Sequence, residues 1–188
     1  MVYNWLNNIQ KWIFPAHCML CGGQADSDVQ HDQDICPACL DSLPQLDNPC
    51  PVCALPVTSG PDLICGQCLQ QAPPYQQTFS AYQYAPPLIQ LVTGLKFHQR
   101  LAVARLFGQL LAQHLEQREF DRPECLIPVP LHPERLRERG FNQSIEIARP
   151  ISKQFDLPID SELCQRLRHT TPQTGLNAKE RRKNIRRA

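Results

Sequence analysis

Apolar side chains recur at helical spacing in three stretches of the chain. The first, residues 1–15, predicts an amphipathic N-terminal helix that ends at Pro15, because proline lacks the N–H that a helix interior uses. The second stretch is a helical stripe made of Val103, Phe107, Leu110, Leu111 and Leu115. The third begins near Asn142 and directs four apolar residues inward: Ile145, Ala148, Ile151 and Phe155. These stripes predict helices that pack on a core.

Shorter apolar runs predict further helices and strands. Short helices are expected at Leu88–Phe97 and at Pro133–Arg139, where the proline suits a first helical turn. The aromatic run at residues 79–84 predicts a strand. Residues 125–129 (CLIPV) are apolar on both faces and bounded by prolines, as in a buried parallel strand. Strands that alternate with helices predict an α/β sheet.

Four Cys-x-x-Cys pairs dominate the N-terminal third of the chain. They are Cys18/Cys21, Cys36/Cys39, Cys50/Cys53 and Cys65/Cys68. Eight thiols at this spacing suit two tetrahedral Cys₄ zinc sites, with two pairs for each Zn²⁺. A redox dithiol is disfavoured, because a redox protein needs one such motif beside a βαβ unit. The cysteine spacing therefore predicts two structural zinc ions and no disulfides.

The pairing of these motifs is open at the level of sequence. Sequential pairing joins the first motif to the second and the third to the fourth, which makes two zinc ribbons in tandem within residues 16–72. Interleaved pairing, of the first motif with the third and the second with the fourth, fits the spacing as well. Gly22 and Gly66 each follow a cysteine and are expected to supply the tight turn of a zinc knuckle.

Charge divides the chain into an acidic and a basic part. Between Cys18 and Cys68 there are seven Asp and no Lys or Arg, and each Cys₄ zinc site adds a charge of about −2. The segment from Arg166 to Arg187 holds eight Lys or Arg against Glu180 alone. We therefore expect a polyanion such as DNA to meet the segment Arg166–Arg187 and to avoid the ribbons.

The sequence contains no apolar run long enough to span a membrane, and its start has no basic segment or cleavage site of a secretory signal. Zinc-bound cysteines also need a reducing compartment. We therefore expect a cytoplasmic protein.

Residues 128–143 read PVPLHPERLRERGFNQ. The Pro-Val-Pro-Leu loop, Arg135 and the run Arg-Gly-Phe-Asn-Gln at 139–143 resemble the ComF family of competence-protein-F or amidophosphoribosyltransferase-like proteins. A second block resembles the same family at Arg166, Arg168, Thr170, Gln173, Leu176, Arg181 and Asn184. The ribbons and Leu95-Lys96-Phe97 fit it too, so the resemblance extends from the N-terminal helix to Ala188.

The resemblance implies a small zinc-ribbon module followed by an incomplete α/β domain of the type I phosphoribosyltransferase-like fold, at residues 73–188. It also implies that the loop after the first core strand contacts pyrophosphate. Four residues occupy that position: Val129, Pro130, Leu131 and His132. Arg135 and Arg139 lie one helical turn apart and can face the same anion. The alternative is a solvated basic face with Glu134 and Glu138 as ion-pair partners.

The chain departs from the family pattern after the second block. Family members continue into a strand, two acidic residues and a Thr-Thr-Gly turn that holds the ribose and 5-phosphate of phosphoribosyl pyrophosphate (PRPP). Thr170-Thr171-Pro172 has no acid pair before it and no glycine after it. We therefore expect a truncated member of the family that is linked to DNA uptake or utilisation and is inactive as a transferase. The alternative is a non-enzymatic zinc-ribbon accessory protein that binds DNA or a partner, such as a competence or DNA-processing protein.

Overall fold

The computed structural model describes residues 16–25, 33–58, 60, 62–97, 100–171, 173 and 175–186. The chain forms two compact units, Met1–Glu119 and Phe120–Ala188, and each is described by itself. The N-terminal helix predicted for residues 1–15 lies outside the described residues. Helices α4 and α5, which the sequence assigns to the second domain, belong to the same unit as the zinc ribbons.

Both zinc ribbons follow one local plan. Each begins with a tight turn that carries the first cysteine pair, closed by an isolated antiparallel bridge: His17 with Gln24, and Pro49 with Pro56. The second pair of each ribbon lies at the start of a short helix, α2 (Pro37–Asp41) or α3 (Gly66–Gln70), with Cys36 or Cys65 as the N-cap. The two cysteines of every pair therefore lie within a single turn of the chain.

One position in each tight turn has a left-handed backbone. In the first ribbon this position is Gly22, with φ of 74°, and in the second it is Ala54, with φ of 57°. Glycine adopts this conformation without strain, whereas the Cβ of alanine makes it costly. The expectation that Gly66 supplies the turn of the second ribbon is wrong, because Gly66 is the first residue of α3.

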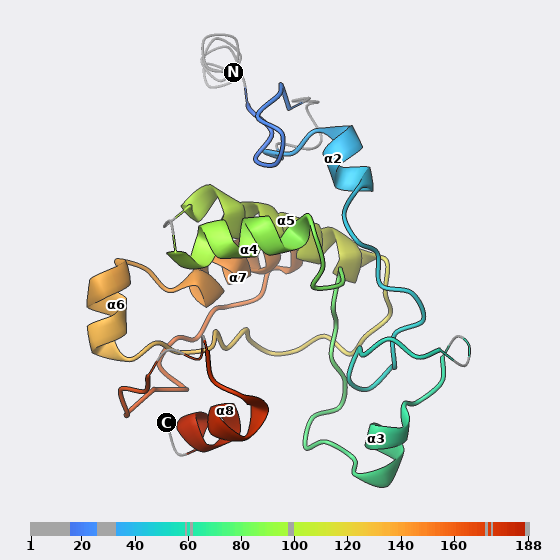
Figure 1. Cartoon of the computed structure of the whole chain (residues 1–188), viewed down its shortest axis with the longest axis vertical. Helices are drawn as coiled ribbons and strands as arrows, with labels where there is room; N and C mark the ends of the chain where they lie inside the picture. The colour runs from blue at the N-terminus through green and yellow to red at the C-terminus, as the bar shows by residue number, and fades with distance from the viewer. Residues whose placement is uncertain are drawn as a thin grey trace. The chain divides into compact units, whose positions relative to one another are not determined.

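Helices α4 (Leu88–Phe97) and α5 (Leu101–Glu116) lie against each other and supply most of the buried apolar residues described in the first unit (Figure 1). Leu91 and Val103 are 1% and 0% exposed. The predicted stripe on α5 is only partly in this core, since Phe107, Leu111 and Leu115 are half-buried. The buried face of α5 consists of Val103, Ala104, Leu106, Gly108, Leu110 and Ala112. Small residues share this face, which hydrophobicity alone did not indicate.

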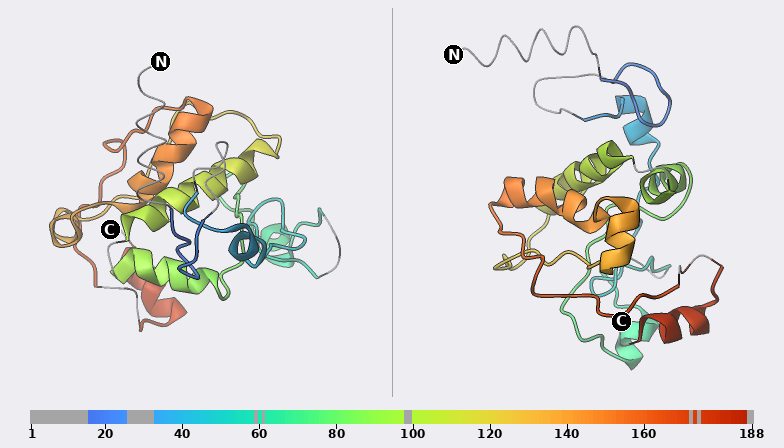
Figure 2. Two further views of the ribbon diagram at one scale, coloured as in Figure 1. Left: turned by 90° about the horizontal axis from the view of Figure 1, so that it is seen from above. Right: turned by 90° about the vertical axis from the view of Figure 1, so that its left-hand side faces the viewer.

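The second unit contains α6 (Pro133–Arg139), α7 (Gln143–Phe155) and α8 (Ala178–Ile185), coloured from orange to red in Figure 2. Helix α7 begins near Asn142, as the sequence predicts, and Asn142 is its N-cap. Ala148 and Ile151 of α7 are buried, together with Leu157 after it. Leu126 forms a parallel bridge with Ile159, so the segments before α6 and after α7 run in the same direction.

The strands expected at residues 79–84 and 125–129 are not formed. The described residues contain isolated bridges but no strand of a sheet. In the first segment Tyr82 forms one bridge with Gln45, and in the second only Leu126 is paired. Ile127 and Val129 are 53% and 67% exposed, so the expectation of burial on both faces is wrong. A parallel strand is buried only when neighbours cover it, and here one residue has such a neighbour.

Candidate metal centres and phosphate-binding site

The eight paired cysteines gather into two clusters. In each cluster the four Sγ atoms all lie within 4.8 Å of one another. The first cluster contains Cys18, Cys21, Cys36 and Cys39, and the second contains Cys50, Cys53, Cys65 and Cys68. This arrangement is sequential pairing. The interleaved alternative would have mixed cysteines of the two ribbons in each cluster.

The sulfur separations fit tetrahedral zinc. Four sulfurs at a Zn–S distance of about 2.3 Å lie about 3.8 Å apart, whereas a disulfide has an S–S distance of about 2.05 Å. Sγ of Cys21 is 3.9 Å from Sγ of Cys36, and Sγ of Cys53 is 3.6 Å from Sγ of Cys65. Because four thiolates leave no open coordination position, both centres hold zinc ions with a structural role.

Backbone N–H groups favour the thiolate at one cysteine of each cluster. The N–H of Cys65 donates to Sγ of Cys50 at 3.3 Å and lowers the pKa of Cys50 to about 6. At Cys18, burial opposes ionisation, but N–H groups of Cys21 and Cys36 outweigh it and lower the pKa to about 6. Cys39 has its pKa raised to about 12, chiefly by hydrogen bonding with Cys36. Full deprotonation of a cluster therefore requires the metal.

The predicted phosphate site centres on two guanidinium groups of α6. Arg135 and Arg139 are both half-buried. Burial lowers the pKa of Arg139, the positive charge of Arg135 lowers it further, and the negative charge of Glu138 opposes this shift. Arg135 Nη1 lies 3.7 Å from Glu138 Oε2. Within the described residues Arg139 has no ion-pair partner, so an anion at this point would be attracted by both groups.

The first turn of α6 offers few free donors to such an anion. Pro133 has no N–H, and the N–H of Glu134 donates to Nδ1 of His132 at 3.3 Å. The helix start was expected to offer free backbone N–H groups beside the loop of residues 129–132, but the side chain of His132 already accepts from one of them, the N–H of Glu134. A phosphate at this point would therefore depend mainly on the guanidinium groups of Arg135 and Arg139.

Asn142 holds the loop before α6, a role that the sequence analysis did not assign. Its side chain is 8% exposed. The amide Nδ2 donates to the carbonyl of Val129 at 3.0 Å, and Oδ1 accepts from the N–H of Ser144 at 3.0 Å. One residue thus caps α7 and fixes the loop of residues 129–132. An asparagine just before an amphipathic helix was the available signal.

His169 joins the two sequence blocks that resemble the ComF family. Its Nδ1 lies 3.2 Å from Glu134 Oε2, and the same oxygen is 4.0 Å from Nδ1 of His132. The two imidazole rings have centroids 5.1 Å apart and an angle of 37° between their planes. Glu134 therefore faces His169 and pairs with neither Arg135 nor Arg139. Arg135 does pair with Glu138, so the solvated-face alternative holds for one of its two carboxylates.

Residues of the basic segment Arg166–Arg187 form hydrogen bonds at both ends of α8, the helix that this segment contains. Asn177 and Glu180 form a reciprocal capping box at the start of the helix, with hydrogen bonds of 3.0 and 2.8 Å. At its end, Arg168 Nη2 donates to the carbonyls of Asn184 and Arg186 at 2.8 and 2.9 Å. The capping pattern Asn-x-x-Glu was a readable signal for this helix.

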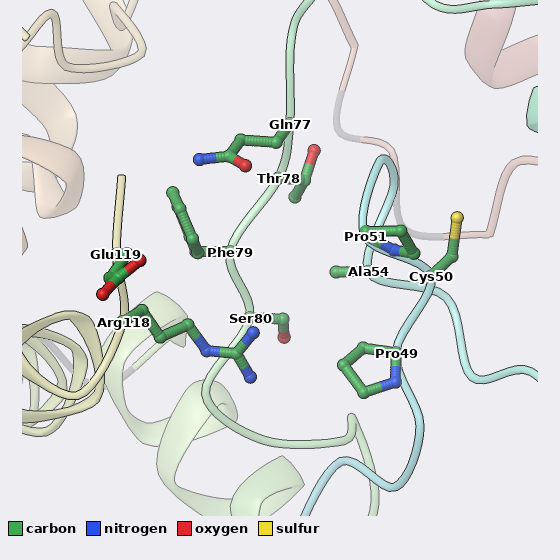
Figure 3. A pocket seen from close by; sticks show the side chains of 10 residues that line it. All are labelled: Pro49, Cys50, Pro51, Ala54, Gln77, Thr78, Phe79, Ser80, Arg118 and Glu119. Atoms are coloured by element: carbon green, nitrogen blue, oxygen red, sulfur yellow. The ribbon is translucent and has the colours of Figure 1, made fainter. Parts of the chain in front are cut away.

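A cavity of about 220 Å³ lies in the first unit, between the second ribbon, residues 77–80 and the residues after α5. Figure 3 shows the Arg118 side chain extending toward Ser80 across it. Of the predicted site residues only Cys50 lines this cavity. Its volume is below that of ordinary small-molecule sites, about 300–1,000 Å³, so it carries no functional assignment. Among the described residues, no helix has the length and apolar content needed to cross a membrane.

Known proteins match the chain along most of its length. A family model described as a double zinc ribbon domain matches residues 9–77. DNA utilization protein YhgH of Salmonella typhimurium is 35% identical over 178 residues, which cover 93% of this chain and 77% of that protein. Competence protein F of Haemophilus influenzae is 35% identical over 130 residues, or 66% and 56% of the two chains. Competence protein ComFC of Bacillus subtilis is 24% identical over 157 residues, or 76% and 65%. No solved structure matches the chain.

Proposed function

Because the chain belongs to the ComF family, we propose that it serves the uptake or use of DNA and binds phosphate groups at the loop before α6. Relatives that it matches are named for DNA utilisation and for competence. The observation that carries the phosphate site is the adjacent pair Arg135 and Arg139, in which Arg139 has no ion-pair partner among the described residues.

We further propose a type I phosphoribosyltransferase-like arrangement for the second unit. The parallel bridge between Leu126 and Ile159 supports it, because α6 and α7 connect the two bridged segments. Parallel segments in one sheet need a long crossover of this kind, usually helical. In such an arrangement the loop of residues 129–132 follows the first bridged segment and faces the phosphate, as the family resemblance implies.

Inorganic pyrophosphate, or the pyrophosphate group of PRPP, is the ligand proposed for this site. An anion between Arg135 and Arg139 would offset the charge of Arg135, which adds to burial in lowering the pKa of Arg139. Guanidinium groups can each donate two parallel hydrogen bonds to phosphate oxygens. Val129, Pro130, Leu131 and His132 would shape the loop around the ligand, and Asn142 would hold the loop in place.

We propose that residues 1–188 by themselves bind pyrophosphate but do not transfer a phosphoribosyl group. Transfer requires that the ribose phosphate be held more tightly in the transition state than in the ground state. In the family this is the task of two acidic residues and a Thr-Thr-Gly turn, and no such sequence occurs in residues 1–188. Turnover of PRPP by this chain with any nucleobase would contradict the proposal.

Calorimetric titration with inorganic pyrophosphate tests the site. Arg139→Ala should weaken binding at least about tenfold, since it removes one of two cations that contact the anion. Arg149→Ala is the matched control, because Arg149 is exposed on α7 and pairs with Glu146 at 3.2 Å. Equal affinities of the wild type and the Arg139→Ala variant would place the phosphate elsewhere. In cells, restoration of DNA use by wild type and Arg149→Ala, but not by Arg139→Ala, would support the physiological role.

A second candidate is a non-enzymatic accessory role, in which the chain binds DNA or a DNA-processing partner. The exposed cations between Arg166 and Arg187 favour it, and the acidic ribbons would then serve protein partners. We assign the protein to the cytoplasm in either case, because eight zinc-bound thiolates need a reducing compartment.

A further inference from the structure

Helix α8 is held in place by hydrogen bonds that involve two charged residues of the segment Arg166–Arg187. Glu180 accepts the N–H of Asn177 in the capping box. Arg168 donates to the two carbonyls at the other end of the helix. On its flank, Asn184 Nδ2 donates to the carbonyl of Thr171 at 2.8 Å. A short polar helix is marginal by itself, so these bonds at both ends and one side give α8 its fixed position.

Three cations of α8 and its C-cap Arg186 form a stripe on the side away from this anchor. At about 100° per residue, Lys179, Arg182, Lys183 and Arg186 fall within an arc of about 100°. The centre of that arc lies about 150° from Asn184, the residue bonded to Thr171. All four side chains are exposed, and within the described part of the chain none has a carboxylate partner. The helix thus offers four unneutralised charges on one outward face.

We propose that this stripe binds the phosphate backbone of double-stranded DNA. The inference rests on the proposed role in DNA uptake or use and names the surface that would contact the nucleic acid. Four cations along about 10 Å of helix can reach several phosphates of a duplex, and an α-helix fits the major groove. Single-stranded DNA is disfavoured, because its binding uses aromatic stacking, and residues 156–188 contain no Phe, Tyr or Trp.

The four-cation stripe predicts a defined salt dependence. Each phosphate contact releases counterions, so four contacts give a slope of log K against log salt of about −3.6. Contacts to phosphate carry no sequence information, and we therefore expect duplexes of different sequence to bind alike. A sequence-independent, salt-sensitive affinity is the signature of this surface.

Fluorescence anisotropy with a labelled 20-base-pair duplex tests the stripe in the full zinc-loaded chain. The triple variant Lys179→Gln, Arg182→Gln and Lys183→Gln should bind at least about tenfold more weakly and reduce the slope to about −0.9, because Arg186 alone remains. Glutamine has nearly the helix propensity of the residues it replaces, so helicity should be unchanged. Arg181→Gln is the control, since Arg181 lies about 150° from the centre of the stripe.

The outcomes separate this inference from the proposed function. A triple variant with the affinity and slope of the wild type would overturn the stripe, as would a wild-type chain that binds no duplex. Single-stranded DNA bound tenfold more tightly than duplex would overturn the choice of partner. The phosphate site is tested separately, by the affinity of the Arg139→Ala variant for pyrophosphate. That variant leaves α8 unchanged, so the two results are independent.

Discussion

The side-chain amide of Asn142 donates a hydrogen bond of 3.0 Å to the backbone carbonyl of Val129. Through its other atom, the carbonyl Oδ1, the same side chain accepts from the first turn of α7. The loop of residues 129–132 is therefore fixed to the start of a thirteen-residue helix. Since a phosphate site must be held rigidly to bind well, this residue should govern both stability and ligand affinity.

Asn142→Ala should lower the free energy of unfolding of the second unit by about 2 kcal/mol, because it removes a helix cap and also the hydrogen bond to the carbonyl of Val129. Urea unfolding followed by circular dichroism measures this. Asn177→Ala, which removes the exposed cap of α8, should cost about 1 kcal/mol and leave pyrophosphate binding unchanged. Similar ligand affinities of the two variants would show that Asn142 does not position the loop.

Metal content should follow the sequential pairing of cysteines. Wild type should contain two zinc ions, and Cys36→Ser should lose the ion of the first cluster and keep the second, because each cluster takes its ligands from one ribbon. Mass spectrometry under native conditions measures the stoichiometry. Cys164→Ser is the control and should retain both ions, since Cys164 is exposed and belongs to neither cluster. Loss of both ions in Cys36→Ser would indicate that the ribbons fold as one unit.

The left-handed turn of the first ribbon should favour glycine over alanine at position 22. Gly22→Ala should weaken zinc binding about five- to tenfold, because a Cβ at φ of 74° costs about 1 kcal/mol and ribbon folding is coupled to the metal. Competition with a chromophoric chelator measures the affinity. Gly66→Ala should leave it equal or improve it, since Gly66 lies in α3 and a Cβ there meets no atom within 4 Å. Equal effects of the two changes would refute the strain argument.

His114 should make the first unit less stable in mild acid. Its Nε2 is buried without a hydrogen-bond partner among the described residues. Burial, and secondarily the charge of Arg118, lowers the pKa of His114 below the ordinary value of 6.5. The unfolded chain therefore binds the proton at higher pH than the folded chain, and stability falls as the pH drops below about 6.5.

Unfolding at pH 7.5 and pH 6.0, with zinc content checked at both, measures this effect. His114→Leu should remove the part of the decline that is due to this residue, whatever its effect on stability at pH 7.5. His169→Gln should keep the decline, since His169 is exposed in the other unit. An identical decline in the wild type and the His114→Leu variant would exclude His114 as its origin.

Helix positions followed from local signals in the sequence. The bounds of α4 and α6 agree with the predicted ranges, and α7 begins next to the predicted Asn142, because proline and capping residues fix helix ends through their own backbone chemistry. The strands could not be predicted from such local signals, because the pairing of strands depends on a neighbouring segment that is distant in sequence. Residues 125–129 have the right composition, yet Leu126 alone finds such a neighbour.

The zinc ligands were readable because a two-residue spacing places both thiols of a pair on one ion. Their pairing required the structure, since spacing alone left two arrangements open. The contact of His169 with Glu134 joins residues far apart in sequence, and no local pattern indicates it. The hydrogen bond from Arg168 to the end of α8 could not be predicted either. In the sequence, an arginine that caps a helix elsewhere in the chain cannot be told from any other surface cation.

Sequential pairing has a consequence for synthesis of the chain on the ribosome. The first zinc cluster is complete once Cys39 has emerged, and the second needs nothing before Cys50. Because each loop closure is short, its entropic cost is small and folding is fast. The nascent chain can therefore capture its first metal ion while the second ribbon is still being translated. A nascent chain that does so exposes at most four of the eight paired thiols at one time, which limits oxidation and wrong pairing during synthesis.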